Sequence, residues 1–368
     1  MIILHVAPIS TKYFSGLNLS IPSTARAQHN LNHEVCILTT SKRGPYETIE
    51  PFPVIYAYEN KKKKRIADLP APFNKPDIII FHSTYIYHHI ILAKEAVKSG
   101  IPYIITPRGG MTLGAQRQKR IKKTIGNILF FNHFVKNASA IHCLTEKEAA
   151  DSNKWGKDIF IVGNGIDLPQ IDSIQKKESN QFVITFIGRL DIHHKGLDLL
   201  VQACGLIREV LEQERVIVRL YGPDQNNSRK VLMDMINSLN LTKVVKMHGP
   251  VKGEHKANAL IESDIFVHTS RFEGHPMSVL EALSYGVPCL LTPGTNVSSE
   301  VREFGAGWEV EGNKNAIAER MLQVIKQKTN LDEYRYKARK LVEDRYTWDK
   351  ISKKLVQNYL EIIQKFDQ

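Results

Sequence analysis

The chain has 368 residues, of which 42% are apolar and 24% are charged. This is enough for two domains with cores of their own, and it excludes a disordered or collagen-like chain. The formal net charge is +12, of which residues 1–170 carry +10 (22 Lys and Arg, 12 Asp and Glu) and the remainder +2. A basic half can meet nucleic acid, an anionic membrane or a phosphorylated substrate, and composition does not choose among them.

Strands and helices alternate in the first half of the chain. Met1 is followed at once by the apolar segment Ile2–Pro8, which we expect to be a strand and not a secretory leader, so we expect a cytoplasmic protein. Thr145 is a predicted helix N-cap, and Glu148 completes a predicted capping box. The other expected elements are helices near Ser23–Leu31 and at Ala93–Lys98, and strands at Glu34–Thr39, Asp77–Phe81, Tyr103–Thr106 and Ala140–Leu144.

The same alternation restarts after Leu168–Gln181, a polar stretch without periodicity that we interpret as an interdomain linker. Alternation of this kind predicts parallel sheets built from βαβ units, and hence an α/β protein with two doubly wound domains, residues 1–167 and 168–349. Ligands of such sheets bind outside the carboxyl ends of the strands. The expected strands are Phe182–Gly188, Val216–Tyr221, Val244–His248, Ile265–Thr269 and Pro288–Thr292, and the expected helices are Leu197–Leu211, Arg229–Leu239 and Ala257–Ser263.

The segment Arg271–Glu281 carries the strongest signal for a binding site. It follows a predicted strand and leads into a helix predicted from Pro276 to Tyr285, because Pro276 suits a first helical turn. A helix N-terminus presents free N–H groups and a positive dipole end, which bind anions. On one continuous helix Glu273 and Glu281 would lie about 80° apart. We therefore expect them to share a site only if the loop curls back over the helix start.

A second segment supplies positive charge. Gly188 permits a tight turn at the end of a predicted strand. Arg189 and Lys195 would place a planar guanidinium and a point charge on a diphosphate. Ordinary solvated side chains are the alternative interpretation for both.

No metal site is expected. The four cysteines lie far apart in apolar runs, which predicts buried, reduced thiols and no zinc site. No Asp-x-Asp pair occurs. Asp191, His193 and His194 could bind a metal, but they lie in a short polar loop between Arg189 and Lys195, which favours ordinary loop residues.

Taken together, these motifs resemble the retaining glycosyltransferases of family 4, which have the GT-B fold of two Rossmann-like domains facing each other across a cleft. Gly188-Arg189-Leu190 with Lys195-Gly196 resembles the family's Gly-Arg-Leu…Lys-Gly motif, and residues 270–282 resemble its Ser-x-x-Glu-Gly-x-Pro…Glu-Ala motif. Asn164-Gly165-Ile166-Asp167 resembles its Asn-Gly-x-Asp. Trp348 resembles the Trp that opens its C-terminal helix, here about 350–368, which returns to the N-terminal domain. The resemblance implies a retaining hexosyltransferase that uses a nucleotide-diphosphate sugar and needs no metal or other cofactor.

The resemblance also implies a role for each matching residue. Arg189 and Lys195 would bind the donor diphosphate and Glu273 would face the sugar, which makes these three the catalytic set. Glu281 would hold the ribose. The other donor-binding positions would be Gly16, Gly188, Tyr221, Gly222, His248, Gly249, Gly274, His275, Pro276, Met277 and Ser278. On the acceptor side the resemblance implies His82, Arg108 and Gly109 of the N-terminal domain.

The leading hypothesis is transfer of a hexose or N-acetylhexosamine from a UDP- or GDP-sugar to a glycan or a lipid-linked oligosaccharide. The Pro-Arg-Gly segment at 107–109 resembles a branch of the family that builds bacterial surface polysaccharides such as O-antigen or capsule. Cations at 117–123 precede apolar residues at 125–134, which favours a helix on the inner face of the plasma membrane. The alternative is a helix packed on the core.

Two other classes of function stay open from the sequence. One is a nucleotide-sugar epimerase of GT-B architecture. The other is a non-catalytic binder of nucleotide sugars or nucleic acid. The sequence shows no recognised RNA-binding motif, so we do not expect nucleic acid as a partner.

Overall fold

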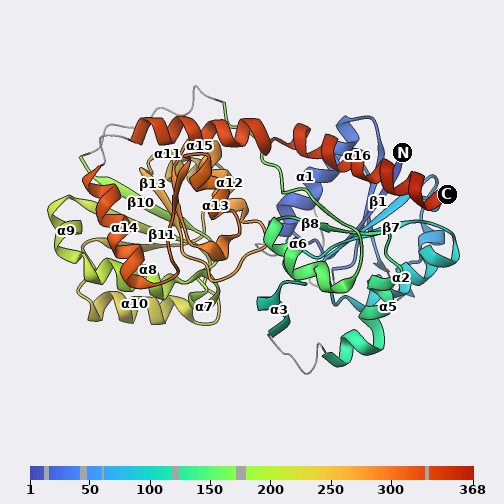
Figure 1. The fold of residues 1–368 in the computed structure, drawn as a ribbon, viewed down its shortest axis with the longest axis horizontal. Coiled ribbons are helices and arrows are strands. Elements are labelled where there is room, and N and C mark those ends of the chain that lie inside the picture. Colours follow the sequence, from blue (N-terminus) through green and yellow to red (C-terminus); the bar gives the residue numbers. More distant parts are fainter. Residues whose placement is uncertain (12–15, 42–47, 60–61, 118–123, 171–179, 328–330) are drawn as a thin grey trace. The chain divides into compact units, whose positions relative to one another are not determined.

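The computed structural model describes all residues except 12–15, 42–47, 60–61, 118–123, 171–179 and 328–330. The described residues form two compact units. The first comprises Met1–Gly165 with Trp348–Gln368, and the second comprises Ile166–Thr347. Each unit is a parallel sheet with helices on both faces (Figure 1). The α/β class expected from the alternation of elements is therefore confirmed.

The first unit is built on a seven-stranded sheet in the order β3-β2-β1-β6-β7-β8-β9, in which every neighbouring pair is parallel. Its strands are β1 Ile2–Ala7, β2 Glu34–Thr39, β3 Val54–Tyr56, β6 Ile78–His82, β7 Tyr103–Thr106, β8 Ala140–Cys143 and β9 Ile159–Ile161. A short antiparallel pair, β4 Tyr58–Glu59 and β5 Lys62–Lys63, lies outside this sheet.

Helices cover both faces of this sheet, which is why its central strands are almost continuously apolar. On one face α1 (Gly16–Asn30) packs against α16 (Trp348–Asp367), and on the other α2 (Tyr87–Lys98) packs with α5 (Asn132–Lys136) (Figure 1). The remaining helical segments are η1 Ile66–Asp68, α3 Leu113–Arg117, the π-helical turn η2 Asn127–Phe131, α6 Glu146–Ser152 and η3 Asn153–Trp155.

The second unit is built on a six-stranded parallel sheet in the order β12-β11-β10-β13-β14-β15. The strands are β10 Phe182–Ile187, β11 Val216–Tyr221, β12 Val245–His248, β13 Ile265–His268, β14 Cys289–Leu291 and β15 Gly307–Glu309. The helical segments are α7 Ile192–Lys195, α8 Leu197–Leu206, α9 Arg208–Gln213, α10 Ser228–Ser238, α11 Gly253–Ile261, α12 Met277–Ser284, η5 Pro293–Thr295, α13 Ser298–Glu303, α14 Lys314–Lys326 and α15 Leu331–Arg345.

The core of the second unit lies between its sheet and three helices. Helices α8, α10 and α14 pack together, and their apolar side chains join those of β10, β11 and β13 in one buried cluster. Helices α12 and α15 pack against each other elsewhere in the unit. Burial of both faces holds the strands in register, so the loops at their carboxyl ends have fixed starting points.

Four predicted helices differ in extent from those observed. Those expected at Ala93–Lys98 and Ala257–Ser263 begin earlier, as α2 at Tyr87 and α11 at Gly253, and α11 ends at Ile261. The helix expected near Ser23–Leu31 begins at Gly16 and runs through Pro22, which lies in its second turn and removes one backbone hydrogen bond of the helix. The helix expected at Leu197–Leu211 is two helices, because the backbone leaves helical geometry at Ile207. The predicted linker Leu168–Gln181 lies largely outside the described residues.

The predicted capping box at Thr145 is only half correct. The Thr145 hydroxyl accepts a hydrogen bond from the Glu148 amide at 3.2 Å, as expected of an N-cap. The Glu148 carboxylate, however, accepts from the Leu144 amide at 2.8 Å and from the Gly109 amide. It therefore ties the helix start to the loop after β7, because the tertiary fold offers it an unpaired amide that the local sequence does not reveal.

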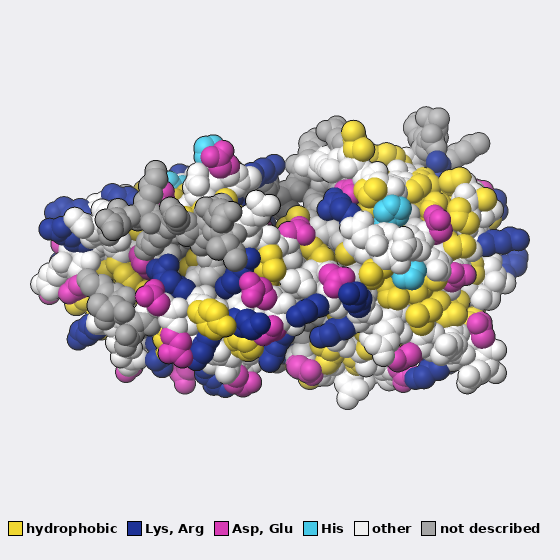
Figure 2. Space-filling model, turned by 90° about the horizontal axis from the view of Figure 1, so that it is seen from above, with side chains coloured by type: hydrophobic (Ala, Val, Ile, Leu, Met, Phe, Trp, Pro, Cys, Tyr) yellow, Lys and Arg dark blue, Asp and Glu magenta, His cyan; other side chains and the backbone are white. Residues whose placement is uncertain are grey.

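Surface charge on the side drawn in Figure 2 is mixed. Lys and Arg side chains are interspersed with Asp and Glu and do not form one continuous basic surface. Proteins that bind nucleic acid usually gather cations on one face, so this face gives no support to nucleic acid as a partner. All four cysteines are buried thiols, as predicted. Among the described residues, no helix is both long and apolar enough to cross a membrane.

Candidate active site

The predicted donor-binding residues of the second unit follow adjacent strands at one edge of the sheet. Gly188 and Arg189 follow β10, while Tyr221 ends β11 and His248 ends β12. The register aligns Ile187 with Tyr221 and Tyr221 with His248. These positions therefore lie side by side where ligands of parallel sheets bind.

The loop after β13 leads into α12, as the sequence predicts. The helix runs from Met277 to Ser284, one residue shorter at each end than expected, and Pro276 is its N-cap. The Val279 amide already donates to the Pro276 carbonyl at 3.1 Å, so the Met277 and Ser278 amides before it are the ones without a carbonyl of the helix to bind, and they leave donors at the carboxyl ends of the strands. An anion at this point would meet free N–H groups and the positive end of the helix dipole.

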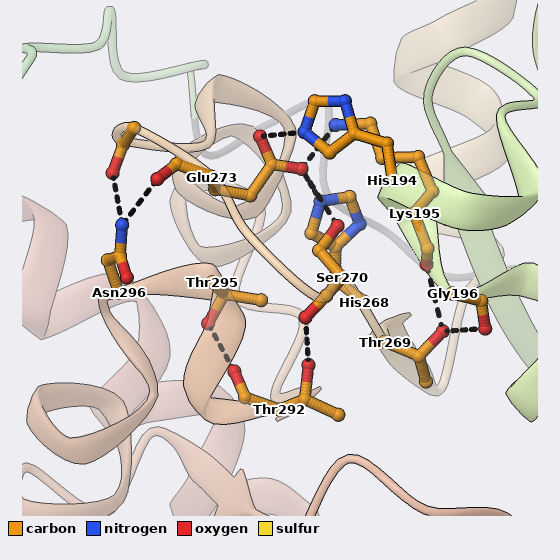
Figure 3. Close-up of polar contacts among 11 residues, drawn as sticks. His194, Lys195, Gly196, His268, Thr269, Ser270, Glu273, Thr292, Thr295 and Asn296 are labelled. Atoms are coloured by element: carbon orange, nitrogen blue, oxygen red, sulfur yellow. Dashed lines mark hydrogen bonds and ion pairs between the residues drawn. The ribbon is translucent and has the colours of Figure 1, made fainter. Parts of the chain in front are cut away.

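The Glu273 carboxylate is the centre of a buried polar cluster (Figure 3). It forms an ion pair with the Lys195 ammonium, and both side chains are only 11% exposed. The same oxygen accepts a hydrogen bond from the Ser270 hydroxyl at 2.8 Å and contacts His268 Nε2 at 3.1 Å. The other oxygen faces His194 Nε2 at 3.8 Å. The cluster joins α7, the end of β13 and the loop before α12.

These contacts decide the protonation of the cluster. Burial raises the pKa of Glu273, but Lys195, the hydrogen bond from His268 and the two imidazoles together outweigh it and hold the pKa well below its ordinary value. Burial lowers the pKa of His268, so this imidazole is neutral near pH 7. A neutral His268 that donates from Nε2 leaves Nδ1 as an acceptor, and this buried atom has no partner among the described residues.

Contacts from the segment after β14 and from α8 fix the loop that carries Glu273. The Asn296 side-chain amide donates to the carbonyls of Glu273 and Gly274. The Thr292 hydroxyl donates to the Ser270 carbonyl at 2.7 Å. The Arg271 guanidinium binds both carboxylate oxygens of Asp198, at 2.8 and 2.6 Å. The loop is thus held on two sides, so its backbone is positioned before any ligand binds.

A short helix places Lys195. The Asp191 carboxylate caps α7 by accepting from the His194 amide at 3.0 Å, which gives this residue a structural role. The Thr269 hydroxyl donates to the carbonyls of Lys195 and Gly196 at 3.2 and 3.0 Å. Gly196 must be a glycine here, because a Cβ atom would lie 2.1 Å from the Thr269 carbonyl oxygen. The Lys-Gly pair of the motif therefore serves close packing as well as charge.

The two carboxylates of the Glu-x7-Glu motif have separate partners. Glu281 lies on α12 and forms an ion pair with Lys256 of α11, and both side chains are mostly buried. Glu273 pairs with Lys195. Each carboxylate is therefore held by its own lysine, which does not suit a pair that exchanges a proton.

Arg189 differs from Lys195 in being exposed. Among the described residues its guanidinium has no hydrogen bond or ion pair, yet its charge acts on the cluster. Burial lowers the pKa of His194, and Lys195 and Arg189 lower it further against the opposite effect of Glu273. The exposed guanidinium is available to a ligand, whereas Lys195 would have to share its ammonium with Glu273.

Near Tyr221 two rings form a stacked pair. The rings of Tyr221 and His248 are 4.5 Å apart and inclined by 16°. The Arg229 guanidinium donates to the His248 carbonyl at 3.0 Å. Gly222 packs so tightly on β10 that a Cβ atom would lie 1.7 Å from the Gly188 carbonyl oxygen. Gly249 follows His248 at an open position with no atom within 4 Å of a Cβ.

The acceptor-side residues and Gly16 lie in the first unit, where Gly16 opens α1. His82 ends β6 and is 2% exposed. Its Nε2 contacts His5 at 2.9 Å, and its Nδ1 accepts from Arg108 at 3.2 Å. Both ring nitrogens of His82 therefore have protein partners, and its role on the acceptor side stays a prediction. Arg108 and Gly109 follow β7 and are partly exposed.

Sequence reasoning missed several residues that build the cluster. His268 and Ser270 are polar positions at the end of an apolar strand, and that contrast could have identified them. Asn296 and Lys256 are distant in sequence and carry no local signal. His275 was expected to present its backbone to the donor, and its side chain is buried against Tyr346 with ring centroids 5.4 Å apart.

Comparisons with known proteins agree with this arrangement. Residues 14–170 match the family model "Glycosyltransferase Family 4", and residues 168–341 match "Glycosyl transferases group 1". A galactosyltransferase of Escherichia coli that acts on GlcNAc-diphosphoundecaprenol is 28% identical over 233 residues, 59% of this chain and 58% of that protein. An uncharacterized glycosyltransferase of Methanocaldococcus jannaschii is 26% identical over 256 residues, 66% of this chain and 61% of that protein. The matches thus span about three fifths of the length of these relatives.

Solved structures resemble the chain over nearly its whole length. Anabaena HepE in complex with UDP and glucose has a TM-score of 0.73, with 16% identity over 98% of this chain and 100% of the other. WaaG, a glycosyltransferase involved in lipopolysaccharide biosynthesis, has a TM-score of 0.64, with 15% identity over 96% and 98%. At this level of identity the likeness shows the shared fold.

Proposed function

This chain belongs to the family 4 glycosyltransferases of GT-B fold, and we propose that it transfers a hexose or N-acetylhexosamine from a UDP- or GDP-sugar. The acceptor is a glycan or a lipid-linked oligosaccharide of a bacterial-type surface polysaccharide. Two relatives support this choice, since one acts on a diphosphoundecaprenol-linked sugar and another is named for lipopolysaccharide biosynthesis. The family assignment favours transfer over the epimerase and non-catalytic alternatives.

The observation that carries the proposal is the placement of cations around the start of α12. Lys195 lies at the Glu273 carboxylate, the exposed Arg189 lies within electrostatic reach of His194, and the helix presents its free amides. A donor diphosphate is a doubly charged anion that suits such a site. The HepE structures were solved with UDP and glucose and with UDP-glucose, which supports this assignment.

Cleavage of the anomeric bond develops negative charge on the leaving diphosphate. Arg189, Lys195 and the α12 amides stabilise that charge, so we propose that the reaction needs no metal ion. Glu273 holds the Lys195 ammonium in place and faces the sugar. Glu281, fixed by Lys256, holds the ribose hydroxyls. We further propose that the anomeric configuration is retained, as in the family.

Titration of the full chain with a panel of UDP-, GDP- and ADP-sugars tests the donor. Binding of one sugar nucleotide raises the melting temperature, because a ligand of the native state stabilises it. The chain is then incubated with that donor and an extract that contains the acceptor. Product formed in the presence of EDTA shows transfer without a metal ion, and NMR of the product gives its anomeric configuration. Isomerised donor without transfer would support the epimerase instead.

Two variants test the residue assignments. Arg189→Ala is expected to reduce transfer by about 100-fold or more, the usual loss when one contact that stabilises transition-state charge is removed. Glu281→Gln is expected to reduce transfer by weakening the hold on the ribose of the donor. Arg208→Ala is the matched control. Arg208 lies on α9, which leads into the amino end of β11, whereas the predicted site lies at the carboxyl ends of the strands. Near-full activity of both site variants, with folded proteins, would refute the placement.

We propose that the first unit also meets an anionic membrane. Tyr87, Ile125 and Phe130 are 57%, 53% and 43% exposed, and the Tyr87 and Phe130 rings are 5.9 Å apart. Phe134, in contrast, was expected in this surface and is buried against Phe81. The cations at 118–123 lie outside the described residues. The exposed aromatics suit the interfacial region of a bilayer.

Flotation with liposomes tests this surface. The chain is expected to float with vesicles that contain phosphatidylglycerol at moderate salt, and Phe130→Ser with Ile125→Ser is expected to weaken binding. Leu206→Ser, which alters an exposed apolar residue of the second unit, is the control. Absence of binding by the unaltered chain would end the membrane proposal and leave the transferase assignment intact.

A further inference from the structure

Arg108 is held in an unusual backbone conformation. Its φ is +52°, in the left-handed region that non-glycine residues rarely enter. Ser83 and Tyr85, in the loop after the neighbouring strand β6, also have positive φ, at 76° and 61°. Such strain costs of order 1–3 kcal/mol per residue and concentrates at functional sites. Three strained residues thus follow two adjacent strands at the carboxyl edge of the first sheet.

The surrounding loop holds Arg108 in this conformation. The Gly109 amide donates to the buried Glu148 carboxylate, and the Thr112 hydroxyl donates to the Gly109 carbonyl at 2.8 Å. Gly110 packs against Thr84, where a Cβ atom would lie 2.1 Å from the Thr84 hydroxyl. The position of the guanidinium is therefore set by the fold, without help from a ligand.

Three of the five guanidinium N–H groups are already used, and every acceptor is neutral. Nε donates to His82 at 3.2 Å, and Nη1 donates to Ser20 at 2.9 Å and to Asn164 at 3.1 Å. The two N–H groups of Nη2 have no acceptor among the described residues. A guanidinium has five N–H donors, so the two N–H groups of Nη2 are left to bind a ligand.

The histidines behind Arg108 cannot neutralise it. His82 accepts from Arg108 at Nδ1 and so donates from Nε2 to His5, which in turn donates to Gln28 at 2.7 Å. This chain of donors requires both rings to be neutral. Burial, with the Arg108 charge, lowers the pKa of His82 well below its ordinary value, and burial lowers that of His5 to about 4. Neutral rings solvate the cation but do not balance its charge.

No carboxylate of the described residues forms an ion pair with Arg108. Glu148 raises its pKa only through longer-range attraction, because both Glu148 oxygens accept from backbone amides. Burial still lowers the pKa of Arg108 to about 10, so the group is charged near pH 7. A partly buried cation without an anion is costly unless a ligand supplies one.

We propose that Arg108 is an oxyanion subsite of the first unit, which binds a phosphate or carboxylate group through Nη2. The contacts of Arg108 described above support the binding of an anion. Its assignment to the acceptor, as the phosphate of a lipid-linked sugar or the carboxylate of an acidic sugar, rests on the proposed function.

Side-chain NMR of the full chain with ¹⁵N-labelled arginine tests the subsite. The Arg108 Nε–H signal is assigned as the one lost in Arg108→Lys. It is expected to shift on titration with either inorganic pyrophosphate or glucuronate, and the active probe identifies the phosphate or carboxylate source. The signal of Arg26, which pairs with Glu50, is the control within the same unit. Sodium chloride at equal ionic strength controls for screening.

If neither anion shifts the Arg108 signal at about 20 mM, well above the millimolar Kd of a weak contact, the subsite is refuted. A shift of Arg189 without one of Arg108 refutes the subsite and leaves the donor site standing. A UDP Kd that rises tenfold in Arg108→Lys would mean that the donor supplies the anion, which overturns the assignment to the acceptor.

Discussion

Replacing Glu273 by Gln removes the counter-ion of Lys195 and keeps the shape of the side chain. Both side chains are 11% exposed, so the ammonium would stay buried without an anion. Removing one partner of a buried ion pair costs about 3–5 kcal/mol. The residual exposure lets water reach Lys195, so we expect a loss of about 3 kcal/mol in the free energy of unfolding. Lys195→Met leaves Glu273 with two neutral donors and should cost about 2 kcal/mol.

A double-mutant cycle separates this ion pair from the rest of the cluster. We expect the double variant to cost about 3 kcal/mol, which gives a coupling energy of about 2 kcal/mol. Urea unfolding is followed by ¹⁹F NMR of fluorotryptophan, because Trp308 is the only tryptophan of the second unit. Glu333→Gln, in an exposed ion pair with Lys337, should leave the unfolding midpoint unchanged. A coupling below about 0.5 kcal/mol would refute the reasoning, since exposed pairs reach that value.

The same ion pair predicts how stability depends on pH. The pKa of Glu273 in the native state is held well below its ordinary value of 4.5. The stabilisation by its ionised form is therefore present above about pH 4.5 and is lost as the pH falls toward the native pKa. Glu273→Gln should flatten this part of the curve of stability against pH.

The two remaining predictions concern pH and packing. The pKa of His5 is lowered from 6.5 to about 4, so the native state should lose up to about 3 kcal/mol as the pH falls from 6.5 to 4. His5→Asn should reduce that slope in urea titrations, while the exposed His255→Asn should not. Gly222→Ala forces a Cβ atom to within 1.7 Å of the Gly188 carbonyl oxygen and should raise the Kd for UDP at least tenfold. Gly312→Ala, in the same unit and with no atom within 4 Å of a Cβ, should bind UDP like the unaltered chain, and equal Kd values for both variants would contradict the packing argument.

Local sequence was sufficient for the architecture because each signal spans few residues. Apolar runs such as 182–188 predict buried parallel strands, and β10 is buried throughout. Thr145 was identified as an N-cap from its neighbours alone. The segment Arg271–Glu281 was placed at the carboxyl end of a strand, which the topology of doubly wound sheets assigns to ligands.

Tertiary structure alone decided which charges meet. Lys195 and Glu273 are 78 residues apart and come together because β10 and β13 are neighbours in the sheet. The sequence predicted that the Glu148 carboxylate accepts a hydrogen bond at the start of its own helix. In the folded chain it accepts from the Gly109 amide of the loop after β7. The sequence by itself determined the strands of both sheets except β3, β9 and β15, the start of α12 to within one residue, and the kinds of charge at the strand ends. It could not determine the partner of each charge, because partners are set by strand order and by the burial that removes water as a competitor.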